Sequence, residues 1–183
     1  MGKTLKLKGL VPGSKVSFSS NNKKKVTITS RGKMKAKKIG HTNITVKADT
    51  LFKAQPVRKE DVLILPGGPG HKQYNECKPL LELLEKHHAE GGRIAAICAA
   101  PSILGHLGIL NGKKATAFPG FEKDLTGAEV LTAPVKVVTD GNITTARGMG
   151  ASIELGLELV RLLISEEKAQ EIGQSVQYLE KQA

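Results

Sequence analysis

The chain has 183 residues, of which 39% are hydrophobic and 3% aromatic, and its formal net charge is +11. This hydrophobic content excludes a disordered chain, and the length allows one full domain or a domain with a small module attached. No apolar run approaches the ~18 residues that a membrane-spanning helix needs, and no signal peptide is recognised, so we expect a cytoplasmic protein. Two cysteines, Cys77 and Cys98, make no disulfide framework.

The positive charge is concentrated in one part of the chain. Residues 1–48 contain 13 Lys and Arg and no Asp or Glu, whereas the remainder contains 15 basic and 17 acidic residues. A basic segment is therefore joined to a nearly neutral domain. The charge of that domain indicates no specific nucleic-acid partner.

Residues 3–48 are predicted to form short β-strands separated by turns. Apolar and polar residues alternate around Leu5 and Val16, and β-branched residues dominate 26–29 and 43–46. The alternating lysines are typical of the solvated face of a β-sheet, and an anion-binding patch is the alternative.

From residue 49 onwards, strands alternate with helices, which predicts an α/β sheet with helices on its faces. Continuous apolar runs predict buried parallel strands at 61–65 and 94–97, followed by a third strand at 114–118. A hairpin over 135–145 is predicted to turn at Asp140-Gly141. Helices are predicted over residues 76–90, 99–107, 150–164 and 166–179.

Two turns at the carboxyl ends of the predicted strands are distinctive, because ligands bind at this edge of open α/β sheets. Cys98 follows the second buried strand and precedes a helix, where the helix dipole and free N–H groups favour a thiolate. Gly67 and Gly68 follow the first buried strand and allow a backbone N–H to approach the same place. The N–H groups of Gly68 and Ala99 are candidates for an oxyanion hole. The alternative is that Cys98 is a buried core cysteine.

The histidines give no indication of a metal site. His87 and His88 lie near the end of the helix at 76–90, where they are expected to complement its C-terminal dipole. His106 lies two helical turns after Cys98, too far to act as its base. No Cys/His cluster has the spacing of zinc ligands, so we expect no metal.

Several segments resemble the ThiJ/PfpI family, in the same order along the chain. They comprise residues 48–52, 63–70, 94–101, 110–116, 119–122 and 140–148. The resemblance extends over residues 46–175 and favours the bacterial deglycase and glyoxalase III-like branch. Protease-like members place a His directly after the cysteine, where this chain has Ala99.

The resemblance implies a flavodoxin-like three-layer sandwich with a mostly parallel sheet, assembled as a homodimer and needing no cofactor. It implies that Cys98 attacks a methylglyoxal-type aldehyde or its adduct on a glycated protein, with Gly68 and Ala99 as the oxyanion positions. A hemithioacetal forms and is released as a hydroxy acid. Oxidation of Cys98 to a sulfinate, as in a sensor of oxidative stress, is the alternative.

Four further residues are candidates for lining the pocket: Gly67, Pro69, His71 and Arg147. His71 follows the glycine turn, and a solvated loop histidine is the alternative. Arg147 lies in a stretch that is near the site in the family, so it would either bind an anion or form a structural ion pair.

The N-terminal segment departs from the family pattern. The family has a Glu that hydrogen-bonds the thiolate and relays a proton, and its position falls here on Phe18. Residues 3–48 resemble instead a bacterial immunoglobulin-like group 2 domain, in segments 15–21, 26–30, 32–40 and 42–48.

We therefore expect two parts: a basic, β-rich immunoglobulin-like segment over 1–48 and a ThiJ/PfpI-type α/β domain over 49–183. Such a join would arise in an unusual gene, an engineered chimera or a generated sequence. The basic segment would replace the family's first strand, which is central in the sheet, and residues 5–10 are the expected substitute strand.

The sequence thus predicts a Cys98-dependent glyoxalase III or protein deglycase that is weakened by loss of the family Glu. The expected partners are a small aldehyde or glycated protein and a second copy of the chain, with no specific nucleic acid and no membrane. A non-catalytic thiol redox sensor or stress-response binding protein is one alternative. A surface or interaction module dominated by the basic segment is the other.

Overall fold

The computed structural model describes residues 57–180 and, earlier in the chain, the backbone of five short strands. The chain divides into two compact units, Met1–Pro56 and Val57–Ala183. The predicted boundary at residues 48–49 lies outside the described residues.

The first unit contains only β-structure among its described residues. Its strands are β1 (Thr4–Lys6), β2 (Ser17–Ser20), β3 (Val26–Ile28), β4 (Lys33–Ala36) and β5 (Ile44–Lys47). They form two antiparallel sheets, β1-β4-β3 and β2-β5. The prediction of short strands is confirmed here, and β4 is a strand that the pattern did not predict.

Strand β1 belongs to a different sheet from the one expected for residues 5–10. Leu5 pairs with Met34 of β4, so β1 is an edge strand of the three-stranded antiparallel sheet. The expectation that this segment adds a strand to the α/β sheet is wrong for Leu5 and Lys6, while residues 7–10 lie outside the described residues.

The second unit is built on a mixed, mostly parallel sheet in the order β10-β11-β7-β6. Its strands are β6 (Val62–Leu65), β7 (Arg93–Ile97), β10 (Val137–Asp140) and β11 (Ile143–Ala146). The pairs β6–β7 and β7–β11 are parallel, and β10 runs antiparallel to β11 after a turn at Gly141. A separate parallel pair consists of β8 (Lys114–Ala115) and β9 (Glu129–Val130).

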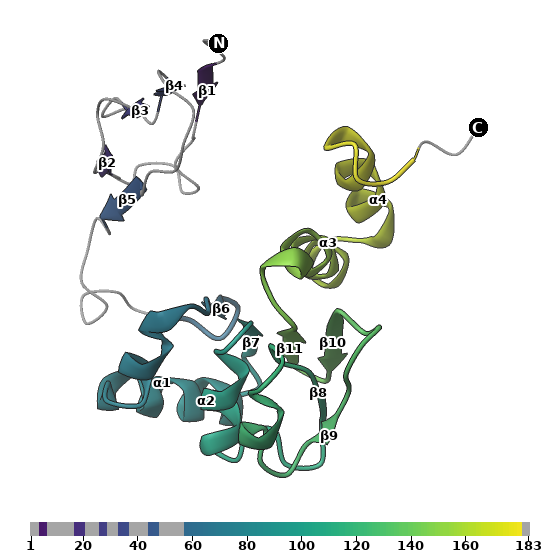
Figure 1. Cartoon of the computed structure of the whole chain (residues 1–183). Helices are drawn as coiled ribbons and strands as arrows, with labels where there is room; N and C mark the ends of the chain where they lie inside the picture. Colours follow the sequence, from purple (N-terminus) through teal and green to yellow (C-terminus); the bar gives the residue numbers. More distant parts are fainter. Residues whose placement is uncertain are drawn as a thin grey trace. The chain divides into compact units, whose positions relative to one another are not determined.

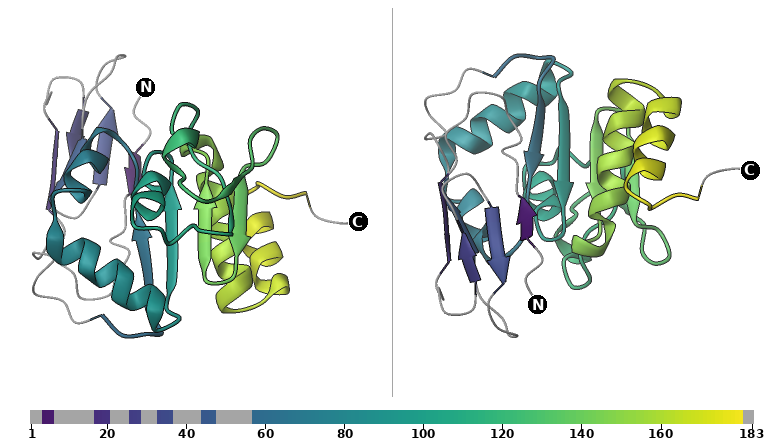
Figure 2. Two further views of the ribbon diagram at one scale, coloured as in Figure 1. Left: turned by 90° about the horizontal axis from the view of Figure 1, so that it is seen from below. Right: turned by 90° about the horizontal axis from the view of Figure 1, so that it is seen from above.

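Helices cover both faces of this sheet (Figures 1 and 2). The α-helices are α1 (Lys78–Ala89), α2 (Pro101–His106), α3 (Ser152–Leu163) and α4 (Glu166–Ser175). Short 3₁₀ helices are η2 (Pro69–Tyr74), η3 (Glu122–Asp124) and η4 (Met149–Ala151). Figure 2 shows α1 and α2 on one side of the sheet and α3 and α4 on the other, so the α/β layering is confirmed.

Each face of the sheet has its own apolar core. The larger cluster joins β6, β7 and β11 to α1 and α2, and includes Leu84, Ile94, Ile103, Leu104 and Ile143. The smaller one joins the opposite face to α3 and includes Ala95, Ala146 and Leu155. Because a fully buried Leu or Ile contributes about 1.5–3 kcal/mol, the larger cluster is the main source of stability in this unit.

The third predicted strand is shorter than the pattern indicates. Pairing stops after Ala115, because the next backbone groups bond outside the sheet ladder. The N–H of Thr116 donates to Oγ1 of Thr145 (3.0 Å), and that of Phe118 donates to the carbonyl of Cys98 (2.9 Å). The segment from Thr116 to Phe118 thereby runs up to the elbow.

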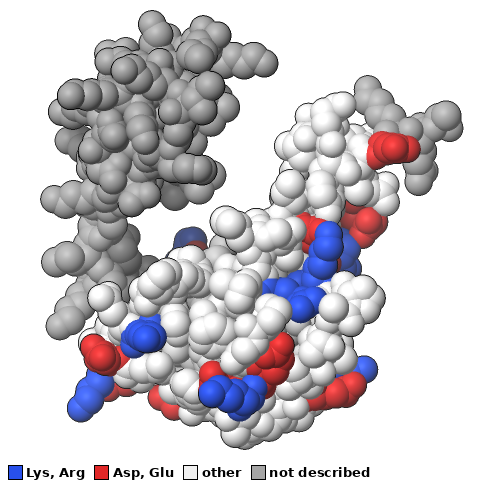
Figure 3. Space-filling view, viewed as in Figure 1, with Lys and Arg blue, Asp and Glu red and all other residues white. Residues whose placement is uncertain are grey.

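Both signs of charge are spread over the second unit. Figure 3 shows Lys and Arg side chains interspersed with Asp and Glu on its visible face. Among the described residues, no helix has the length and apolar character needed to cross a bilayer. The same residues contain no cluster of His, Cys, Asp and Glu that could hold a metal ion.

Candidate active site

Cys98 occupies a strained turn at the carboxyl end of β7. Its φ angle is +66°, in the left-handed region that side-chain-bearing residues rarely adopt. The turn is held in place from both sides, because the Cys98 N–H donates to the Ala146 carbonyl (2.9 Å) and the Cys98 carbonyl accepts from Phe118 (2.9 Å). Such strain costs about 1–3 kcal/mol and is concentrated at functional sites. The side chain of Cys98 is partly exposed, which excludes a fully buried core cysteine.

Gly67 lies directly against this elbow. A Cβ added at Gly67 would lie 2.5 Å from the Cys98 Cβ, 2.8 Å from the Ile97 carbonyl oxygen and 3.1 Å from the Ala99 nitrogen. These distances leave no room for a side chain, so the close approach of the two turns requires glycine at this position. The structure thus brings together the two turns that the sequence singled out.

Two backbone N–H groups, one in the glycine turn and one in the elbow, have no acceptor within residues 57–180. They belong to Gly68, whose φ of +95° also favours glycine, and to Ala99. Ala99 is buried, and its carbonyl accepts the hydroxyl of Ser102 (2.7 Å), which fixes the first turn after the elbow. Two N–H groups without an acceptor among the described residues are the kind of donors that the predicted oxyanion hole would need.

Two side chains of the loop after β6 form hydrogen bonds with backbone carbonyls of the same loop. Nδ1 of His71 donates to the Gly68 carbonyl (2.8 Å), and the Tyr74 hydroxyl donates to the Pro66 carbonyl (2.9 Å). Burial raises the pKa of Tyr74 above its ordinary value. Pro69 begins η2 and is exposed. The loop thus holds the glycine turn in one conformation.

His71 is more than a solvated loop residue. Its ring meets the ring of Phe121 edge-on, with the centroids 5.2 Å apart. Because Nδ1 donates to a carbonyl, the neutral ring carries its proton there and leaves Nε2 as an acceptor. His71 thereby joins the glycine turn to the loop that contains Phe121.

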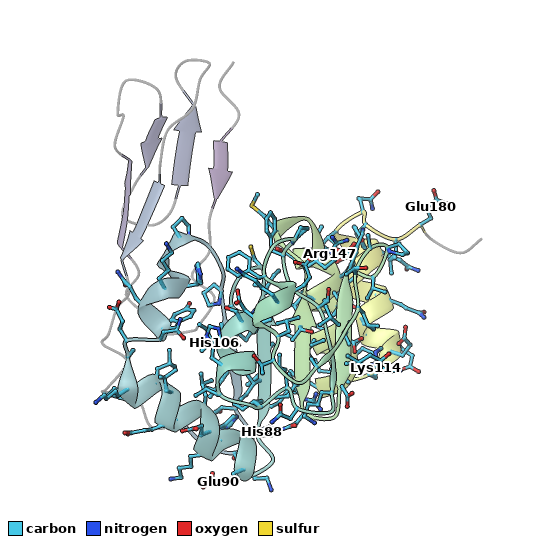
Figure 4. The ribbon with its side chains drawn as sticks, turned by 60° about the horizontal axis from the view of Figure 1, so that its bottom comes forward. His88, Glu90, His106, Lys114, Arg147 and Glu180 are labelled. Carbon is cyan, nitrogen blue, oxygen red and sulfur yellow. The ribbon has the colours of Figure 1, made fainter. Side chains whose placement is uncertain are left out.

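Arg147 and Cys98 both lie at the carboxyl end of the sheet's parallel strands. Arg147 follows the last residue of β11, and its N–H donates to the Lys136 carbonyl (2.9 Å). Figure 4 shows it at the end of the sheet away from His88 and Lys114. Its side chain is half-buried.

Phe118 is a neighbour of the site that the sequence reasoning missed. Besides its backbone bond to Cys98, its ring lies so close to Gly148 that a Cβ there would approach Cδ2 to 3.1 Å. Phe118 is 46% exposed, and Met149, which directly follows Gly148, is 87% exposed. The sequence signal that could have identified Phe118 is its position at the end of a predicted strand, directly before Pro119.

The other singled-out residues have structural surroundings. His87 is buried, with Nε2 near the carbonyls of Asp61 (3.2 Å) and Arg93 (3.3 Å), rather than merely facing a helix dipole. Burial, with a contribution from Lys113, lowers the pKa of His88. Nδ1 of His106 lies 3.2 Å from Oδ1 of Asn75, and Cys77 caps the start of α1 without a side-chain bond.

The sequence pattern of the DJ-1/PfpI family matches residues 12–162. Protein DJ-1 homolog A of Arabidopsis thaliana is 39% identical over 132 residues, which are 71% of this chain and 34% of that protein. A deglycase of Pyrococcus abyssi is 33% identical over 124 residues, covering 68% of this chain and 75% of the relative. The chain thus spans about a third of the plant relative's length.

The fold comparison agrees with the sequence comparison. The crystal structure of Drosophila melanogaster DJ-1beta superposes with a TM-score of 0.61 and 35% identity, covering 65% of this chain and 64% of that chain. The family match begins at residue 12 and therefore extends into the segment that resembles an immunoglobulin-like domain. The comparisons give that second resemblance no support.

Proposed function

Because this chain belongs to the DJ-1/PfpI family, we propose that it is an enzyme in which Cys98 attacks methylglyoxal-type aldehydes or their adducts on proteins, as a glyoxalase III or deglycase. The observation that supports this most strongly is the elbow geometry of Cys98, with φ of +66° and Gly67 in contact. A strained residue with a nucleophilic side chain is retained where its position serves the chemistry.

The proposed reaction uses few groups. The Cys98 thiolate adds to the aldehyde carbon and forms a hemithioacetal, while the N–H groups of Gly68 and Ala99 stabilise the developing oxyanion. Transfer of hydrogen to the neighbouring carbonyl carbon gives a thioester, and water releases the hydroxy acid and restores the thiol. Neither a metal nor an organic cofactor takes part.

The missing carboxylate is expected to weaken this activity. Residues 1–48 contain no Asp or Glu, and Phe18 stands where the family pattern has its Glu. General acid–base help is typically worth ~10²–10⁴-fold in rate. We therefore propose that methylglyoxal turnover falls below that of a family member with its Glu by a factor in this range.

The first test is replacement of each cysteine in turn. Cys98→Ser is expected to abolish methylglyoxal turnover, measured as loss of the aldehyde, whereas Cys77→Ser leaves it unchanged. In the wild-type protein, iodoacetamide should label Cys98 faster than Cys77, measured by peptide mass spectrometry. Turnover that survives Cys98→Ser would contradict the proposal.

A thiol sensor without catalysis is the second candidate, favoured by the absence of carboxylates in residues 1–48. The two N–H groups beside Cys98 would stabilise a sulfinate as they would an oxyanion. Treatment with hydrogen peroxide should then add two oxygens to Cys98 before Cys77. Rapid sulfinate formation without methylglyoxal turnover would favour the sensor over the enzyme.

We also propose the homodimer and the cytoplasmic location that the resemblance and the cysteine content suggest. Light scattering on the purified chain measures its mass in solution. A monomer at micromolar concentration would contradict the dimer.

A further inference from the structure

Arg147 and Cys98 leave neighbouring strands at the same level of the sheet. Strands β11 and β7 are parallel, with Ala146 opposite Ile97, and the Cys98 N–H donates to the Ala146 carbonyl (2.9 Å). The residues that follow these partners are Arg147 and Cys98 themselves. The backbone of a cationic residue therefore lies beside that of the proposed nucleophile. Figure 4 shows Arg147 at the end of the sheet away from His88.

Arg147 has no carboxylate partner among residues 57–180. The cations of the ion pairs described there are Arg58, Lys86, Lys136, Arg161 and Lys168. In particular, Glu154 at the start of α3 is bonded to Lys136. Of the two alternatives for Arg147, the structural ion pair is therefore not formed within the described residues.

A guanidinium without a carboxylate partner is a binding group for anions. It stays charged at any physiological pH and presents a planar fork of donors that matches carboxylate and phosphate oxygens. Arg147 is half-buried, so its charge is less screened than that of a fully exposed lysine. Its backbone is held by the bond to Lys136, which limits its movement away from the elbow.

We infer that Arg147 makes the Cys98 site selective for carbonyl compounds that carry an anionic group, a carboxylate or a phosphate. The inference rests on the proposed function insofar as Cys98 is the thiol that adds to the carbonyl. In that addition the Cys98 sulfur bonds to the carbonyl carbon, the C=O π bond breaks and the thiol proton passes to the oxygen. The anionic group of the same compound then binds to the Arg147 guanidinium.

Two alkylating reagents that differ in charge test this selectivity without requiring turnover. Iodoacetate and iodoacetamide both transfer a two-carbon group to the Cys98 sulfur and release iodide, but only iodoacetate is an anion. We expect Arg147→Gln to lower the ratio of the iodoacetate to the iodoacetamide rate constant at Cys98 by about threefold at low ionic strength. The ratio also cancels any change in the fraction of thiolate.

Arg161→Gln is the matched control, because it removes the same charge from α3, where Arg161 is bonded to Glu158. This variant should leave the ratio unchanged. An unchanged ratio in Arg147→Gln, or an equal fall in both variants, would overturn the inference. If Cys98 labels no faster than Cys77, the proposed function is contradicted, while the ratio at Cys98 still decides the role of Arg147.

A pair of two-carbon aldehydes extends the test to carbonyl compounds. Glyoxylate carries a carboxylate where glycolaldehyde carries a neutral hydroxymethyl group. Glyoxylate should protect Cys98 from iodoacetamide at concentrations where glycolaldehyde does not, and Arg147→Gln should remove this difference. Equal protection by both aldehydes in the wild-type protein would overturn the inference.

Discussion

At the scale of single residues, the site depends on two backbone positions with opposite requirements. Cys98 must keep a side chain in the left-handed region, which costs a non-glycine residue about 1–3 kcal/mol. Gly67 must have no side chain, because its missing Cβ would lie within 2.5 Å of the Cys98 Cβ. The strain at one position is thus maintained by close packing at the other.

Gly67→Ala is expected to destabilise the protein and to displace Cys98. A methyl group forced into a packed contact typically costs about 1–3 kcal/mol, since the backbone or the neighbouring side chain must move. Urea unfolding measures the loss of stability, and the iodoacetamide rate at Cys98 measures the displacement.

Gly70→Ala is the control for this change. Gly70 lies in the same loop, but no atom would come within 4 Å of its Cβ. A stability loss in Gly70→Ala as large as that in Gly67→Ala would contradict the packing argument.

At the scale of elements, the carboxylate of Glu158 on α3 bonds both to its own helix and to the sheet. Glu158 accepts two hydrogen bonds from Arg161 (both 2.7 Å) and one from the Thr139 hydroxyl of β10 (2.7 Å). The bond from Arg161 is the main reason why the pKa of Glu158 is lowered from its ordinary value of 4.5. The ionised form of Glu158 is therefore stabilised mainly by Arg161 within α3, and the bond from Thr139 also links it to β10.

Because the pKa of Glu158 is lowered, we expect the stability that Glu158 contributes to decrease at acidic pH. A carboxyl group whose pKa is lowered by folding contributes stability above its unfolded pKa, near 4.5 here, and loses it as the pH falls through its folded pKa. Glu158→Gln should therefore be less stable than wild type at neutral pH, with the difference shrinking on acidification below 4.5. Urea unfolding across this pH range provides the measurement.

Glu171→Gln serves as the comparison on α4. Glu171 pairs with Lys168 at the surface, where a salt bridge is worth ~0–1 kcal/mol. Equal and equally pH-dependent losses in the two variants would show that Glu158 makes no special contribution.

At the scale of the whole molecule, β6 is an edge strand of the sheet in the second unit, next to the interior strand β7. Strand β7 is flanked by β6 and β11, whereas β6 pairs only with β7 among the described residues. Ile64 in β6 is 54% exposed, although its strand is as apolar as a buried one. An apolar edge strand is a position where a further strand can add.

Hydrogen exchange distinguishes a free edge from a paired one. We expect the amides of β7 to be protected more strongly than those of β6, because β7 is bonded on both sides. Exchange is measured on the full chain by mass spectrometry of peptides covering 61–65 and 93–97. Equal protection of the two strands would show that another segment pairs with β6.

The sequence alone predicted where the helices and strands of the second unit lie, and it identified Cys98 as the candidate reactive thiol. The apolar runs at 61–65 and 94–97 are local patterns that predicted β6 and β7 and placed Gly67 and Cys98 after the ends of these strands. Burial was predicted correctly for β7 but not for β6, in which only Leu65 is buried and Ile64 is exposed. The four helices of the second unit were likewise predicted from local patterns, within a few residues at their ends. The helix predicted from residue 99 begins instead at Pro101, because residues 98–100 form the elbow.

Only the tertiary structure decided how these parts meet. The positive φ of Cys98, the early end of the strand after Ala115 and the nearness of Phe118 all depend on backbone bonds between segments that are distant in the sequence. The lack of a carboxylate beside Arg147 among the described residues is likewise a property of the packed chain. A local pattern specifies which residues are buried, but the partner of each polar group is set only when the segments pack together.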